Sequence, residues 1–327
     1  MCRLLIYVLI AGFCALSALA APPLQTFTIR DHLRHQWSDE LVHFDINYVG
    51  SMPRALTLTD TAGQPVPCQF SGLSRKNGRV TGTVWTVVSL PPKGQTTFHL
   101  RSGKLLATGL TVRQQGNEYR LANECLAVRL PKLPGILKKP VALAKLPAPL
   151  LAVTSAGTDT WIGTGAWVNE DQPLLVKEAT TTIVEQGPVR VTVRYRLIFT
   201  DERFYQADIT LGARQDAVLF NDETTVDAPT AAFRFAFQSG FNADRIYWRN
   251  NYFADPAKGL TPGAIDFTKA QVLCTMRPWS FWWNKDLTAW AGFYKEGAEP
   301  FVGIITLRPS RWMSPRRRQA FPLRRRR

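Results

Sequence analysis

The sequence has few histidines, and none in its second part. All four, His32, His35, His43 and His99, precede residue 100. A Ser-His-Asp triad and a histidine-ligated metal site both need an imidazole, so neither can form from residues beyond His99. His32 and His35 are three residues apart, but no third ligand accompanies them. We expect a polar loop there, no metal site and no cofactor.

Cysteine is also scarce. Cys2 and Cys14 lie in an apolar leader, which leaves Cys68, Cys125 and Cys274. An odd number of thiols cannot form a complete disulfide framework, and no C-x-x-C pair suggests zinc. Because cysteine is often buried as a small apolar residue, we expect buried free thiols, with one disulfide left open as an alternative.

Long apolar runs are absent except at the start. Arg3 precedes the run Leu4 to Leu19, and Ala18-Leu19-Ala20 supplies the small residues that signal peptidase requires. This pattern predicts a signal peptide over 1–21 and a secreted or periplasmic protein. No other segment is long enough to predict a membrane span.

Positive charge is plentiful but unevenly placed. The net charge is +15, and arginines crowd the end of the chain, at Arg311, Arg316, Arg317, Arg318, Arg324, Arg325, Arg326 and Arg327. Without them the chain is only mildly basic, so we expect no nucleic-acid partner. Like charges repel, which predicts a disordered tail over 313–327; polyanion binding by the tail is the alternative.

Most of the chain has the two-residue periodicity of β-strands. Val42, Phe44, Ile46 and Tyr48 alternate with polar residues, and a longer alternation covers 189–199. The proline-rich stretch 131–149 cannot be a central strand and is predicted as an extended loop. We predict an all-β protein, with a small N-terminal β-sandwich over 22–108 followed by a large antiparallel β-supersandwich over 109–312.

Three segments carry a resemblance to a known family. They are LANECLAVRLPKLPG, TTIVEQGPVRVTVRYRLIF and FYQADITLGARQDAVLFNDETTV, with Asn123, Glu185 and Arg190 at matching positions. Over about residues 50–240 the chain resembles the galactose-mutarotase-like β-supersandwich domains of secreted α-mannosidases and polysaccharide lyases. The resemblance implies this fold and a glycan as partner. Such enzymes carry a separate catalytic domain, which suggests that the chain is an incomplete part of one.

Two pairs of adjacent carboxylates are candidates for sugar chemistry. Glycoside hydrolysis needs two carboxyl groups facing one sugar. Neighbouring residues of a strand point to opposite faces, so neither Asp201-Glu202 nor Asp222-Glu223 is itself such a pair. We expect turn carboxylates that face water, with one member of each pair converging on a site as the alternative.

Two aromatic segments supply the other candidate site residues. The stretch Arg245 to Tyr252, predicted as a loop, holds the candidate lyase groups Arg249, Asn250 and Tyr252. In RPWSFWWNKDL, strand alternation places Trp279 and Trp283 on a core face and Trp282 on the other. Indole rings stack on sugar C–H faces, so the predicted carbohydrate contacts are Trp282, Trp248 and Asn284.

These observations give one leading hypothesis and two alternatives. The leading hypothesis is a secreted glycan-recognising β-sandwich protein that binds oligosaccharide or polysaccharide and forms the non-catalytic or incomplete part of a polysaccharide-degrading enzyme. One alternative is a complete polysaccharide lyase that uses the Arg245–Tyr252 segment. The other is a structural cell-envelope protein without a sugar site.

Overall fold

The computed structural model describes residues 22–158, 160–169, 174–226, 231–237, 245–249, 263–264, 289–295 and 298–306. Contacts divide the chain into two units. The first holds the residues up to Ser38 together with Val42–Leu106, and the second holds Asp39–Leu41 and the residues from Ala107 onward. The predicted domain limits, 22–108 and 109–312, stay a prediction.

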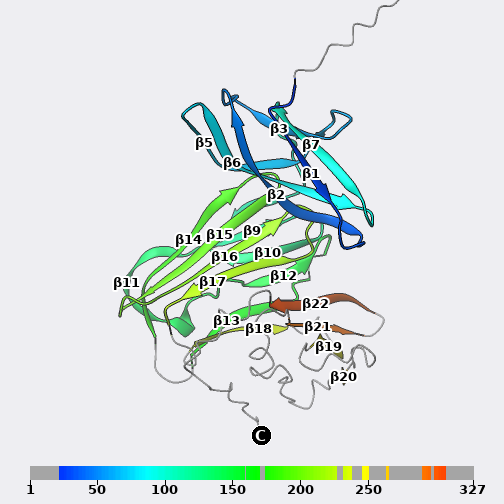
Figure 1. Ribbon diagram of the computed structural model, residues 1–327. Helices are drawn as coiled ribbons and strands as arrows, with labels where there is room; N and C mark the ends of the chain where they lie inside the picture. The colour runs from blue at the N-terminus through cyan, green and yellow to red at the C-terminus, as the bar shows by residue number, and fades with distance from the viewer. Residues whose placement is uncertain are drawn as a thin grey trace, which may run out of the picture. The chain divides into compact units, whose positions relative to one another are not determined.

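The first unit is a small sandwich of two antiparallel sheets (Figure 1). One sheet has the order β1-β7-β3-β4 and the other the order β2-β6-β5. Apolar side chains that alternate along these strands, among them Ile46, Leu58 and Leu100, form its core. The strands are β1 (Gln25–Arg30), β2 (Trp37–Val49), β3 (Leu56–Thr59), β4 (Pro65–Val66), β5 (Cys68–Lys76), β6 (Arg79–Leu90) and β7 (Gln95–Ser102).

The second unit is built on a larger sandwich. A sheet of order β12-β10-β9-β8 shares one apolar core with a five-stranded sheet of order β11-β14-β15-β16-β17 (Figure 1). The strands are β8 (Thr111–Gln115), β9 (Glu118–Ala122), β10 (Leu126–Pro131), β11 (Pro134–Ala142), β12 (Ala152–Ser155), β14 (Leu175–Gln186), β15 (Arg190–Phe199), β16 (Phe204–Gly212) and β17 (Val218–Thr224).

Strand β15 shows why this sequence forms this sheet. Val191, Val193, Tyr195, Leu197 and Phe199 all point into the core and are almost completely buried. The residues between them face outward, where polar pairs cover the sheet. The Arg194 guanidinium, for example, donates two hydrogen bonds of 2.8 Å to the Asp208 carboxylate across the strand pair. The long strand predicted over 189–199 is thereby confirmed over Arg190–Phe199.

The proline-rich stretch 131–149 was predicted as an extended loop, which is wrong over 134–142. Residues Pro134–Ala142 form β11, which is the edge strand beside β14. Its pairing is interrupted between Ile136 and Val141, and Pro140 lies in that interruption. An edge strand tolerates a missing N–H, because only one side of it pairs with a neighbour. The exclusion of a central strand was therefore correct, but the conclusion drawn from it was not.

Among the described residues, the second unit also contains two smaller sheets. Strands β13 (Gly163–Asn169) and β18 (Ala231–Phe237) pair with each other, and β19 (Arg245–Arg249), β20 (Gly263–Ala264), β21 (Ala289–Lys295) and β22 (Ala298–Thr306) form a sheet of order β20-β19-β21-β22. The loop predicted from Arg245 is thus wrong over 245–249, where the backbone pairs with both β20 and β21.

The fold class is confirmed as all-β, with a small sandwich followed by a large antiparallel one. In the segments that the structure describes, the only helical turn is η1 (Leu143–Lys145). None of their helices is long or apolar enough to cross a membrane.

Candidate functional site

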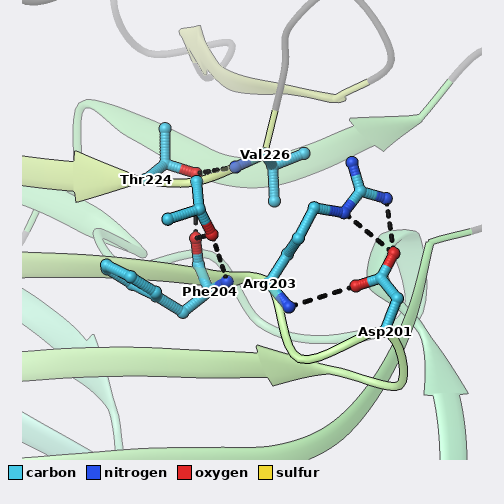
Figure 2. Close-up of polar contacts among 6 residues, drawn as sticks. Asp201, Arg203, Phe204, Thr224 and Val226 are labelled. Carbon is cyan, nitrogen blue, oxygen red and sulfur yellow. Dashed lines mark hydrogen bonds and ion pairs between the residues drawn. The ribbon is translucent and has the colours of Figure 1, made fainter.

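The first carboxylate pair is structural. Asp201 and Glu202 lie exposed in the turn between β15 and β16, as predicted. The Asp201 carboxylate accepts hydrogen bonds from the backbone N–H and the guanidinium of Arg203, 3.2 and 2.8 Å long (Figure 2). Those bonds hold the pKa of Asp201 below its usual value. Glu202 pairs with Lys177. Both carboxylates are therefore engaged in ion pairs at the protein surface.

Hydroxyl groups next to this turn fix the end of β17. Thr224 Oγ1 donates to the Phe204 carbonyl and accepts from the Val226 N–H, both at 3.0 Å (Figure 2). Thr225 Oγ1 accepts from the Phe204 N–H at 2.8 Å. These bonds tie the end of β17 to the start of β16. They hold the last residues of β17 in strand register, including Asp222.

The second carboxylate pair was wrongly predicted as a turn. Asp222 and Glu223 belong to β17, opposite Ala207 and Gln206 of β16. Asp222 therefore shares the inner face with Ala207 and Tyr195, while Glu223 points to the outer face. Asp222 is half-buried, and burial raises the pKa of its carboxyl. The two carboxylates have different surroundings because strand alternation separates them.

Trp167 reaches the same region from β13, which is held by close backbone contacts. A Cβ on Gly165 would lie 1.7 Å from the Leu150 carbonyl oxygen, so only glycine fits there. The Gly165 N–H donates to the Leu151 carbonyl at 2.9 Å. On its other side β13 pairs with β18, where Trp167 lies opposite Phe233. The sequence GTGAW thus places the Trp167 indole next to β18 and Phe233.

A short hydrogen-bonded chain fixes the indole in place. Trp167 Nε1 donates to Tyr195 Oη at 3.0 Å, and Tyr195 Oη donates to the Pro147 carbonyl at 2.9 Å. Burial raises the pKa of Tyr195, so the hydroxyl stays protonated. Tyr205 meets the edge of Trp167 at 5.0 Å between ring centroids and 87° between planes. The indole is therefore held by polar and aromatic contacts together.

Two phenylalanines extend this cluster to the solvent. Phe220 and Phe233 are 38% and 37% exposed, and their rings lie nearly parallel, 17° apart, with centroids separated by 6.3 Å. Phe233 also contacts Trp167 at 6.3 Å. Phe220 and Asp222 are two residues apart on one face of β17. We call Trp167, Tyr205, Phe220, Asp222 and Phe233 the aromatic edge.

The carboxylate of Asp222 makes the aromatic edge a surface that accepts hydrogen bonds. Burial and then the negative charge of Asp222 raise the pKa of Tyr205. In the described part of the chain, Asp222 forms no ion pair. Its oxygens remain acceptors for a ligand hydroxyl beside two flat rings. Such a combination can hold a sugar by stacking and by hydrogen bonds.

Substitution of Asp222 tests its burial. A carboxyl whose pKa is raised by folding stabilises the fold fully below its unfolded pKa, and this contribution is lost as the pH rises through the folded pKa. Asp222→Asn should therefore raise Tm relative to the wild type at pH 7 and have little effect near pH 3. Thermal melts across that range measure this. A Tm that falls at pH 7 but not near pH 3 would show instead that the charged carboxylate stabilises the fold.

Most site residues predicted from the sequence lie outside this region. Arg249 and Trp248 belong to β19, and for this strand the structure gives the backbone pairing with β21. Asn250, Tyr252, Trp282 and Asn284 lie outside the described residues. Their roles stay predictions. The aromatic edge itself was missed, although alternation through VLFNDET places Phe220 and Asp222 on one face.

Metal-ligating residues do not gather in the residues that the structure describes. No group of three or more His, Cys, Asp and Glu there could hold an ion. Cys68 and Cys125 are free thiols, the first buried and the second half-buried. Burial raises the pKa of the Cys68 thiol to about 11, so it is an unreactive core group. Cys274 lies outside the described residues.

Comparison with known proteins gives a likeness of fold. No family model and no curated protein matches the chain. An α-mannosidase from Enterococcus faecalis V583 matches 86% of it with a TM-score of 0.50 and 13% identity, over 39% of the longer chain. A glycosyl hydrolase family 38 protein from Enterococcus faecalis matches 86% of it with a TM-score of 0.49 and 12% identity, over 40% of its own length. The chain thus spans well under half the length of these structures, and what it shares with the α-mannosidase is an all-β fold.

Proposed function

We propose that this chain is a glycan-recognising β-sandwich protein and that the aromatic edge is its sugar-binding surface. The observation that carries the proposal is the exposed Phe220–Phe233 pair beside the half-buried carboxyl of Asp222. Each of these partly exposed rings offers apolar surface to the C–H groups of a pyranose, and the carboxylate accepts hydrogen bonds from its hydroxyls. The fold likeness to an α-mannosidase chain supports a carbohydrate ligand.

The proposed role is recognition within a polysaccharide-degrading enzyme, with little hydrolysis by this chain alone. Hydrolysis needs two carboxyl groups about 5 to 9.5 Å apart around one sugar. Among the described residues, the aromatic edge contributes one, Asp222, because Glu223 faces the other side of the sheet. A galactose-mutarotase-like relationship, export from the cytoplasm and the contribution of Trp282, Trp248 and Asn284 belong to the same proposal.

Replacing Phe220 tests the sugar-binding surface. Calorimetric titration against a panel of neutral oligosaccharides should give dissociation constants in the millimolar to high-micromolar range, because two exposed rings contribute only about 1 to 3 kcal/mol. Phe220→Ala should weaken binding by about three- to tenfold, since one aromatic contact contributes about 0.5 to 1.5 kcal/mol.

Leu219 provides the matched control. It is the neighbouring residue on the same strand, is 47% exposed and lies on the opposite face of the sheet. Leu219→Ala should leave the dissociation constant unchanged. Equal weakening by the two variants, or no heat with any neutral oligosaccharide, would refute the assignment of the aromatic edge.

A further inference from the structure

A row of arginines crosses the other sheet of the large sandwich. Arg113 of β8, Arg120 of β9 and Arg129 of β10 are direct cross-strand partners. Directly opposite residues share one face of a sheet, and the opposite face, with Leu121 and Val128, belongs to the core. We call these three arginines the basic row. Neighbouring strands lie about 4.8 Å apart, so the row spans about 10 Å of outer surface.

A tryptophan lies against this row. Trp161 has the Arg129 guanidinium carbon 4.5 Å from its ring centroid and that of Arg120 at 5.6 Å. Trp161 lies in the segment that follows β12. Thr154 Oγ1 of β12 contacts that segment, at 2.6 Å from the Thr160 carbonyl oxygen and 2.8 Å from the Thr158 hydroxyl. Cation–π contacts hold the two guanidiniums beside a half-exposed indole.

The positive charge of the basic row is only partly neutralised by the residues that the structure describes. Glu118 lies 3.6 Å from Arg129 Nε, too far for a hydrogen bond, and that buried nitrogen has no hydrogen-bond partner there. Arg113 and Arg120 form no ion pair within the same described segments. Like charges directly opposite each other destabilise a sheet. The row therefore carries a cost to the fold that a bound anion would offset.

We propose that the basic row and Trp161 form a binding site for an acidic saccharide, a sugar ring that bears a carboxylate. The guanidinium fork matches a carboxylate in shape and binds it through two parallel hydrogen bonds. The indole beside it suits the C–H face of the same ring. Glu118 beside Arg129 shows that a carboxylate fits against this row. The three arginines lie on β8, β9 and β10, which contribute no residue to the aromatic edge, and the proposal does not rest on the function proposed for that edge.

Titration of the full chain in low-salt buffer tests this site. The probes are a short oligogalacturonate, a neutral manno-oligosaccharide of the same length and a single-stranded oligodeoxynucleotide of the same charge. Arg120→Gln should weaken oligogalacturonate binding by about tenfold, the usual effect of losing one charge-assisted contact. Arg120→Lys should weaken it too, because lysine keeps the charge but lacks the planar fork. Neutral oligosaccharide binding should not change.

Charge-matched and stability controls separate the outcomes. Lys138→Gln removes one exposed positive charge from the edge strand β11 and should leave oligogalacturonate binding unchanged. Arg120→Gln should leave Tm unchanged or raise it, since it relieves cross-strand repulsion.

The proposal fails if oligogalacturonate does not bind. It also fails if Arg120→Gln leaves oligogalacturonate binding intact, which is the result expected if the arginines after Leu307 bind the ligand instead. It also fails if the oligodeoxynucleotide binds as tightly, which indicates general attraction between charges. Phe220→Ala should leave oligogalacturonate binding intact, so the two sites are tested separately.

Discussion

Asn123→Ala is expected to lower the free energy of unfolding by about 3 kcal/mol, because it leaves several buried backbone groups without partners. Asn123 Nδ2 donates to the Gly212 and Gln215 carbonyls at 2.6 and 2.7 Å. Its Oδ1 accepts the backbone N–H groups of Cys125 and Leu126, both at 2.8 Å. The buried amide thus joins the β9–β10 turn to the end of β16, one from each sheet of the large sandwich.

Thermal and urea melts measure this loss. A change of about 3 kcal/mol corresponds to a fall in Tm of about 6 to 12 °C for a unit of this size. The matched control is Asn221→Ala, an exposed asparagine on β17 that should stay within about 0.5 kcal/mol of the wild type. Equal melting of the two variants would contradict the bridging role of Asn123.

Trp167→Ala should destabilise the fold by about 3 to 5 kcal/mol, as truncations of buried aromatic residues do. The indole is 8% exposed and contacts three aromatic rings, those of Tyr195, Tyr205 and Phe233. Its loss also removes the hydrogen bond that Tyr195 Oη accepts. Chemical denaturation with linear extrapolation gives the change in free energy.

A second tryptophan of the same unit serves as the control. Trp161 is half-exposed and packs on arginines, so Trp161→Ala should cost only about 1 to 2 kcal/mol. A loss as large as that of Trp167→Ala would mean that Trp161 is a core residue. A small effect of Trp167→Ala would mean that β13 is not fixed to the sandwich by its indole.

The motifs that carry the family resemblance turn out to have structural roles. Asn123 bridges the two sheets, and Glu185 pairs with Arg190 at 3.1 Å across the β14–β15 hairpin, both side chains being mostly buried. The fold depends on the hydrogen bonds and ion pairs of these residues, so their presence in a sequence indicates the fold. This explains why the sequence predicted an all-β sandwich well. The long strand β15 was equally predictable from the sequence. Each of its inward residues is apolar, and each outward residue except Ile198 is polar.

The candidate site was harder to predict because long-range packing assembles it. Phe220 and Asp222 share a face of β17, but nothing local indicates that β13 and β18 deliver Trp167 and Phe233 beside them. The pattern of prolines likewise concealed β11, because its place at the edge of the sheet depends on the partner strand. In the Arg245–Arg249 segment, polar residues suggested a loop, yet pairing with β20 and β21 makes it a strand.

Backbone hydrogen exchange with and without a bound neutral oligosaccharide is the most direct test of the aromatic edge. Exchange slows where a ligand suppresses local opening. If the edge is the binding surface, protection should increase along β17, over Val218–Thr224, and along β18, over Ala231–Phe237. Protection confined to 245–306, with β17 and β18 unchanged, would place the sugar elsewhere and contradict the account.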